Sequence, residues 1–141
     1  MSINFCNEDV ELPAFNFRVI KEVLKKESIL QHLKLEEVNY IFCSDEYLLT
    51  INQNFLKHDY FTDVITFDYS EDIKLAGDIY ISLERVLDNS VTYEVSFLNE
   101  LIRVISHGFL HLLKFDDKED DDIFKMRKKE EELIGKIFSL L

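Results

Sequence analysis

The stretch 64–82, VITFDYSEDIKLAGDIYIS, decides the fold class. It contains two strand-like runs, 64–69 and 77–82, which are separated by a short polar loop. In the second run Ile79 and Ile81 alternate with more polar neighbours, as a strand with one buried face requires. Two such runs so close together predict an antiparallel pair.

Further strands and helices surround this pair. Upstream, strand-like and helical patterns alternate: a strand over 2–6, a helix that starts near Pro13 and reaches Leu30, a strand over 37–43, and a helix from Ser44 or Asp45 to Phe55. Downstream, only helical patterns follow: a short one over 83–89, a long one from Tyr93 to Leu113, and a last one after the acidic segment 116–122. The order β-α-β-α-β-β-α-α-α predicts an α+β fold, a single domain over 1–141 with a mixed sheet of about four strands and helices packed on it.

The chain is strongly acidic, and this limits its partners. Its 141 residues include 28 Asp and Glu against 16 Lys and Arg, a formal net charge of −12. This charge argues against a general nucleic-acid binder, whose surface is normally basic, and against docking on an anionic membrane. It leaves room for a local basic strip beside a specific site.

The N-terminal segment and the cysteines predict a cytoplasmic protein. Segment 1–15 has neither the basic n-region nor the continuous apolar h-region of a signal peptide, and no apolar run approaches the roughly 20 residues that span a bilayer. Cys6 and Cys43 each lie in a strand-like apolar stretch. The sequence alone allows a disulfide between them, but we favour two reduced, buried thiols in a cytosolic protein.

The most informative residues for function lie in segment 106–117, SHGFLHLLKFDD. His107 and His111 are four residues apart on the long predicted helix, so both imidazoles lie on one face, one turn apart. Asp117 follows after the helix ends, and a loop that turns back can bring its carboxylate to the same ion. Two imidazoles, one carboxylate and an open position for water describe a catalytic zinc site better than a closed structural one.

A metal is not the only explanation for the two histidines. Asn99, Glu100 and Arg103 share their helix face, so all five side chains could form a solvated polar stripe. Gly108 favours the metal interpretation, because a glycine inside a helix costs about 1 kcal/mol relative to alanine and marks a close backbone approach. Gly108 also stands where zinc peptidases carry the general-base glutamate of His-Glu-x-x-His, so the spacing does not predict a protease.

Segment 107–117, HGFLHLLKFDD, resembles the His-Gly-x-Leu-His-Leu-x-Gly-Tyr-Asp-His signature of the YbeY family, bacterial metal-dependent endoribonucleases of rRNA maturation and ribosome quality control. Further blocks are similar to that family and occur in the same order: Asn52–Phe55 through Thr62–Phe67, Gly77–Ser82, and Met126 and Arg127 with Glu130. The resemblance implies a single-domain α+β fold, a zinc ion bound by three side chains of the signature, and a single-stranded RNA substrate.

Residue by residue, the resemblance implies that His107 and His111 are the first two metal ligands. Asp117 stands at the third ligand position, where the family normally has histidine. A carboxylate can take that place, since two histidines and one carboxylate hold catalytic zinc elsewhere, and it widens the choice to other divalent transition metals. Lys114 stands where the signature has its second glycine, so the turn after the helix cannot rely on a glycine.

The resemblance also points to a change in how the substrate is held. Leu56 stands where family members commonly carry an arginine, the natural phosphate clamp. Lys57 and His58 are the nearest substitutes, and Arg103 lies one helical turn before the first histidine, where it could face the same cleft. Each has a structural alternative: Lys57 and His58 as exposed polar loop residues, and Arg103 in an ion pair with Glu100.

The sequence favours a zinc-dependent, single-strand-specific endoribonuclease of rRNA maturation and ribosome quality control. In this hypothesis His107, His111 and Asp117 hold the metal, and a water in the open position attacks the phosphodiester once it is ionised. The expected partners are single-stranded RNA or rRNA and the ribosome or its associated proteins, with no membrane. The alternatives are a metallohydrolase with a non-RNA substrate, and a non-catalytic ribosome-assembly factor in which the metal is structural.

Overall fold

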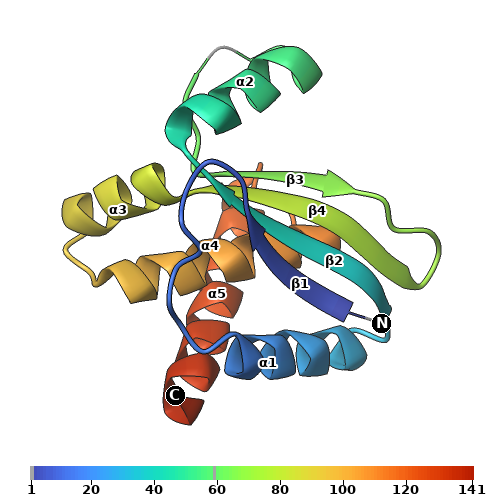
Figure 1. Cartoon of the computed structure of the whole chain (residues 1–141). Coiled ribbons are helices and arrows are strands. Elements are labelled where there is room, and N and C mark those ends of the chain that lie inside the picture. The colour runs from blue at the N-terminus through green and yellow to red at the C-terminus, as the bar shows by residue number, and fades with distance from the viewer. Residues whose placement is uncertain (1, 59) are drawn as a thin grey trace.

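The protein is a mixed β-sheet with helices on both faces, shown in Figure 1; the computed structural model describes residues 2–58 and 60–141. Within these residues the strands are β1 (Ser2–Asn7), β2 (Lys34–Cys43), β3 (Val64–Asp68) and β4 (Lys74–Ser82). The helices are α1 (Phe17–Leu30), α2 (Asp45–Phe55), α3 (Leu83–Thr92), α4 (Phe97–Leu112) and α5 (Asp120–Leu140). The element order and the four-stranded mixed sheet confirm the predicted α+β fold.

The strand order in the sheet is β1-β2-β4-β3. The pairs β1–β2 and β2–β4 are parallel, and β3 runs antiparallel to β4 with Val64 opposite Ile81 and Asp68 opposite Gly77. The antiparallel pair predicted for 64–82 is therefore confirmed. Its consequence for function is that β3 forms one edge of the sheet, next to α4.

The main core lies between the sheet and helices α1, α4 and α5. Helix α4 contributes most of its apolar side chains, including the fully buried Ile102, Ile105 and Phe109. The hydroxyl of Tyr40 on β2 donates a hydrogen bond to the Ile105 carbonyl at 2.9 Å, which ties the middle of the helix to the middle of the sheet. A smaller cluster on the other face of the sheet packs α2 against Ile65 of β3.

Two glycines let α4 and β4 approach closely. A Cβ atom on Gly108 of α4 would lie 2.7 Å from Cγ2 of Ile79 on β4. A Cβ atom on Gly77 of β4 would lie 2.7 Å from Cδ2 of Leu112 on α4 and 2.6 Å from the Phe67 carbonyl oxygen. Each element thus has a glycine where a side chain of the other element packs. The close backbone approach predicted at Gly108 is found, and it is an approach of α4 to the sheet.

The helix starts differ from the sequence expectations at three places. Helix α5 begins at Asp120, inside the acidic segment 116–122 that was expected to be a loop, so three aspartates form its first turn, where the helix dipole favours negative charge. Helix α1 begins at Phe17 rather than near Pro13, because the side chain of Asn16 accepts a hydrogen bond from the Val19 N–H and caps the helix there. Helix α4 begins at Phe97 rather than at Tyr93, because the Ser96 hydroxyl caps the Asn99 N–H. The start of α2 was predicted correctly, with Ser44 as its N-cap.

The two cysteines differ in their exposure to solvent. Cys6 and Cys43 are both free, but only Cys43 is buried. On the edge strand β1, Ile3 and Phe5 face the main core, so the side chain of Cys6 lies on the opposite face, where it is exposed. The prediction of two buried thiols was therefore wrong for Cys6. None of the helices in the described chain is long and apolar enough to cross a membrane.

Candidate metal centre

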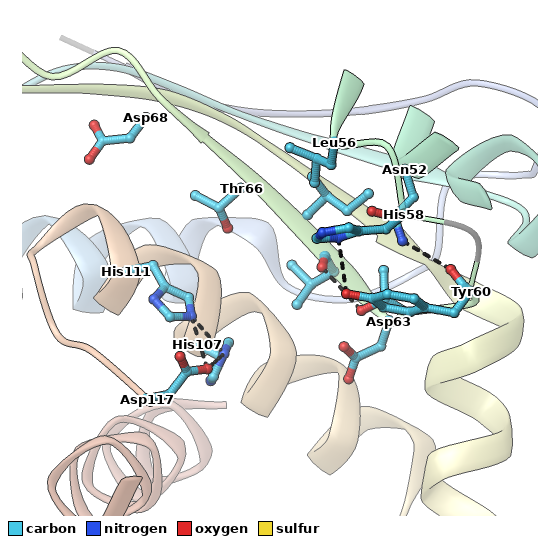
Figure 2. A pocket seen from close by; sticks show the side chains of 13 residues that line it. Asn52, Leu56, His58, Tyr60, Asp63, Thr66, Asp68, His107, His111 and Asp117 are labelled. Carbon is cyan, nitrogen blue, oxygen red and sulfur yellow. Dashed lines mark hydrogen bonds and ion pairs between the residues drawn. The ribbon is translucent and has the colours of Figure 1, made fainter. Parts of the chain in front are cut away.

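The end of α4 and the loop after it bring three possible ligand atoms together. His107 and His111 project from one face of α4, and their Nε2 atoms lie 2.9 Å apart. The Oδ2 atom of Asp117 lies 3.4 Å from each of these nitrogens. Figure 2 shows the three side chains facing one another at one side of a cavity. The structure thus brings together the three side chains that the sequence singled out.

Each histidine is oriented through its other ring nitrogen. The Nδ1 atom of His107 lies 2.5 Å from Oε2 of Glu130 on α5, and the Nδ1 atom of His111 lies 3.2 Å from the Phe115 carbonyl oxygen. Both partners are acceptors, so we assign the proton to Nδ1 in each ring. The two Nε2 lone pairs and the Asp117 carboxylate then face one another. Such a group is stable with a cation between its members, and an acceptor behind each ring is typical of metal-binding histidines.

The donor set and its spacing fit zinc. A tetrahedral zinc ion with bonds of about 2.0–2.1 Å separates its ligand atoms by about 3.3 Å. The 3.4 Å distances from Asp117 to both histidines match this separation, and the 2.9 Å between the histidines is somewhat shorter. Burial, followed by the neighbouring His107, lowers the pKa of His111. A lower pKa favours the neutral imidazole, which is the form that binds a metal.

The turn at the end of α4 directs the chain back toward the histidines. The Phe115 N–H donates to the Leu110 carbonyl and the Lys114 N–H to the His111 carbonyl, both at 3.0 Å, which is a Schellman motif. Lys114 has a φ of 73°, a left-handed conformation that glycine adopts most easily. Its ammonium group forms an ion pair with Asp68 on β3, so the turn is also tied to the sheet edge.

A group of partly or fully buried charges lies behind His107. The Arg103 guanidinium binds both carboxylate oxygens of Glu100, at 2.5 and 2.9 Å, and lies 3.4 Å from Glu130 and 3.5 Å from Asp63. Its hydrogen bonds to Glu100 raise the pKa of Arg103, while burial raises the pKa of Asp63 even though Arg103 opposes this. Glu100 is buried, so the polar face of α4 is not a solvated stripe at this position.

A cavity of about 590 Å³ opens in front of the three ligand atoms. Its opposite side is the loop after α2, which contributes Leu56, His58 and Tyr60, as Figure 2 shows. Of the three residues predicted to contact phosphate, His58 lines this cavity, whereas Lys57 and Arg103 are not among its described lining residues. Arg103 lines a smaller cavity of about 160 Å³ that also borders His107 and Asp117.

Comparison with known proteins gives a consistent answer. The family model described as Endoribonuclease YbeY matches residues 3–137. The chain belongs to the YbeY family. Among curated YbeY endoribonucleases, that of Flavobacterium johnsoniae is 44% identical over 133 residues, which cover 94% of this chain and 95% of the relative. That of Flavobacterium psychrophilum is 48% identical over 84% of this chain and 91% of the relative. The solution structure of TM1509 from Thermotoga maritima superposes with a TM-score of 0.69 at 26% identity, over 98% of this chain and 90% of that one.

At three positions this chain departs from the YbeY signature, and the structure shows where each of these residues lies. Lys114, at the position of the second signature glycine, keeps the left-handed turn that a glycine would adopt. Asp117 occupies the third ligand position and its carboxylate faces both histidines. Leu56, at the position of the common arginine, lines the cavity with an apolar side chain that is 41% exposed.

Three residues lie at this YbeY site in positions that the sequence did not reveal. Glu130 was recognised only as part of the terminal-helix block, and its contact with His107 depends on how α5 packs on α4. The Thr66 hydroxyl is buried in the cavity wall, with no hydrogen-bond partner within the described chain. Tyr60 had one available signal, an aromatic residue in a short polar connection between a helix and a strand.

Proposed function

We propose that this protein is a zinc-dependent endoribonuclease that cleaves single-stranded RNA in the cytoplasm, in rRNA maturation and ribosome quality control. One observation carries the proposal: the ligand atoms of His107, His111 and Asp117 converge beside a cavity of nucleotide size in a chain of the YbeY family. The names of the curated relatives support RNA as the substrate. rRNA and the ribosome or its associated proteins are the expected partners.

We assign the metal to His107, His111 and Asp117. A bound zinc ion supplies a Lewis acid for the phosphoryl oxygen and lowers the pKa of water. Glu130 and the Phe115 carbonyl hold the two imidazoles in the orientation that presents Nε2 to the cavity.

The three residues predicted to contact phosphate receive different roles in this proposal. His58 lines the cavity and is assigned to contact the substrate there. Lys57 precedes it on the same loop and is assigned to a phosphate outside the cavity. The Arg103 guanidinium is already bound to Glu100 and lies near Glu130, so it is assigned to position the carboxylate that orients His107.

Two measurements on protein purified without a chelator or an affinity metal test the proposal. Elemental analysis is expected to find one zinc ion per chain, which would support Asp117 as a ligand. Cleavage of a labelled single-stranded RNA is expected to stop with a chelator, to return with zinc, and to be absent in His111→Ala. Equal cleavage in all these samples would contradict the metal mechanism.

A metallohydrolase with a non-RNA substrate is the second candidate, and the charge of the cavity favours it. The described lining residues include Asp63, Asp68 and Asp117 and no lysine or arginine, which is unusual for a site that receives a polyanion. A zinc-loaded protein that neither binds nor cleaves single-stranded RNA, yet hydrolyses a small chromogenic phosphodiester, would favour this candidate.

A further inference from the structure

The walls of the large cavity differ in what they can offer to RNA. The side with the proposed metal ligands is polar and anionic, whereas the loop after α2 presents the side chains of Leu56, His58 and Tyr60. Because no lysine or arginine lies among the described lining residues, the part of the loop inside the cavity has little with which to bind a phosphate group, and Lys57 can serve only a phosphate outside it. Its aromatic and apolar surfaces suit the flat face of a base.

The two aromatic side chains are arranged as a stacked pair. The rings of His58 and Tyr60 are 5.2 Å apart between centroids and inclined by only 19°. The Tyr60 hydroxyl lies 3.0 Å from Nδ1 of His58, which links the two rings at their polar ends. Tyr60 is 56% exposed, so much of its surface is available for another flat ring.

The loop that carries this pair is anchored to the body of the protein at one buried residue. The Asn52 side chain, which is 2% exposed, donates a hydrogen bond to the Tyr60 carbonyl at 2.9 Å, and the Asn52 carbonyl accepts from the His58 N–H at 3.0 Å. Both members of the pair are therefore held by the same residue of α2. This anchoring limits the conformational entropy that would be lost when a base stacks on the pair.

We propose that His58 and Tyr60 form a stacking subsite for one unpaired nucleobase of the RNA, next to the bond that is cleaved. The inference rests on the proposed function, since it concerns the same cavity and the same substrate. The new element is that the His58–Tyr60 pair contacts a base of the RNA and not its sugar-phosphate backbone. Stacking needs a base that is free of a partner strand, which gives a physical reason for cleavage of single strands.

The test compares three variants of the zinc-loaded protein. Tyr60→Ala removes the ring, Tyr60→Phe keeps the ring and removes the hydroxyl, and Tyr93→Ala is a control at a tyrosine of similar exposure, 60%, that does not line the cavity. We expect Tyr60→Ala to raise KM for a short single-stranded RNA about tenfold and to leave zinc content unchanged. Tyr60→Phe and Tyr93→Ala should retain the wild-type KM.

A second measurement identifies the base directly. The RNAs for this measurement resist cleavage and each carry one abasic nucleotide. Their binding to the zinc-loaded wild-type protein, measured by fluorescence anisotropy, should weaken about tenfold when the abasic nucleotide stands at one position beside the bond that is normally cleaved. Tyr60→Ala should bind this abasic RNA and the intact RNA equally. Three results would overturn the subsite. The KM of Tyr60→Ala could equal that of Tyr93→Ala, or the KM of Tyr60→Phe could rise as much as that of Tyr60→Ala. The third is that Tyr60→Ala still binds the abasic RNA more weakly than the intact RNA. A wild-type protein that does not act on RNA at all would instead overturn the proposed function, and the subsite with it.

Discussion

The two sides of the large cavity are built in opposite ways. The metal wall, defined as His107, His111 and Asp117, is fixed from behind: each histidine has its own acceptor, and α4 is packed deep in the main core. The loop wall, defined as Leu56, His58 and Tyr60, is exposed and depends on hydrogen bonds with Asn52. The difference indicates that folding fixes the geometry of the reaction, whereas substrate preference depends on side chains that can change without loss of the fold.

The largest effect should come from removal of a ligand in the metal wall. His111→Ala leaves one imidazole and one carboxylate, which is too few to hold zinc firmly. We expect zinc content to fall below detection and RNA cleavage to fall to the level of a sample without protein, as measured by elemental analysis and a gel assay. His32→Asn is a matched control, because His32 is exposed on a turn with a φ of 60°, which asparagine tolerates. Full zinc occupancy in His111→Ala would exclude it as a ligand.

The next effect should come from the support behind the metal wall. Glu130→Gln keeps an oxygen near His107 but removes the negative charge that holds its Nδ1 proton. We expect metal affinity or activity to fall about 10- to 100-fold. Glu131→Gln changes the same charge on the exposed side of α5 and should leave both unchanged. The measurement is a zinc titration against a competing chelator, and equal affinities for the two variants would show that Glu130 does not support the site.

A smaller effect, on stability, should follow when a methyl group is added at the close contact between α4 and the sheet. Gly108→Ala places a Cβ atom 2.7 Å from Cγ2 of the fully buried Ile79, so the neighbours must move. We expect unfolding free energy to fall by about 1–2 kcal/mol in urea titrations, because the strain exceeds the gain in helix propensity. Gly135→Ala meets no atom within 4 Å and should instead stabilise α5 by about 0.5–1 kcal/mol. Opposite signs for the two variants are the result to look for.

The smallest effect should come from the anchor of the loop wall. Asn52→Ala removes the hydrogen bond to the Tyr60 carbonyl, and we expect it to lower unfolding free energy by about 1 kcal/mol. The variant should also have a higher KM for RNA but an unchanged zinc affinity, because the hydrogen bonds of Asn52 described above go to the loop wall and not to the metal wall. Asn54→Ala, at an exposed position of the same helix, is the control. A parallel loss of zinc affinity would show that the two walls are not separable.

Most of the fold was predictable because the apolar residues keep their periods of two and 3.6 through the strands and helices. The meeting of His107 and His111 was predictable for the same reason, since a spacing of four residues brings the two side chains to one helix face. The start of α1 is not near Pro13, because proline is compatible with a first helical turn without requiring one, whereas the side chain of Asn16 caps the helix just before Phe17. Exposed Cys6 was missed because a strand-like stretch does not say which face is covered.

The parts of the site that could not be predicted depend on contacts between distant residues. Glu130 reaches His107 only because α5 crosses α4, and no local pattern encodes that crossing. The return of Asp117 depends on a left-handed residue at Lys114, where the chain lacks the glycine that would have predicted the turn. The pairing of Tyr60 with His58 depends on the path of a short loop held by Asn52.

The reciprocal glycine contacts of α4 and β4 also fix where the two histidines lie in the molecule. With Ile79 seated at Gly108 and Leu112 seated at Gly77, α4 cannot slide along β4 without a clash at one of the two points. Because α4 carries both His107 and His111, their place relative to β3 and to the loop after α2 is set by packing when the protein folds. The depth at which the cavity presents its imidazoles is thus determined by hydrocarbon contacts between a helix and a sheet.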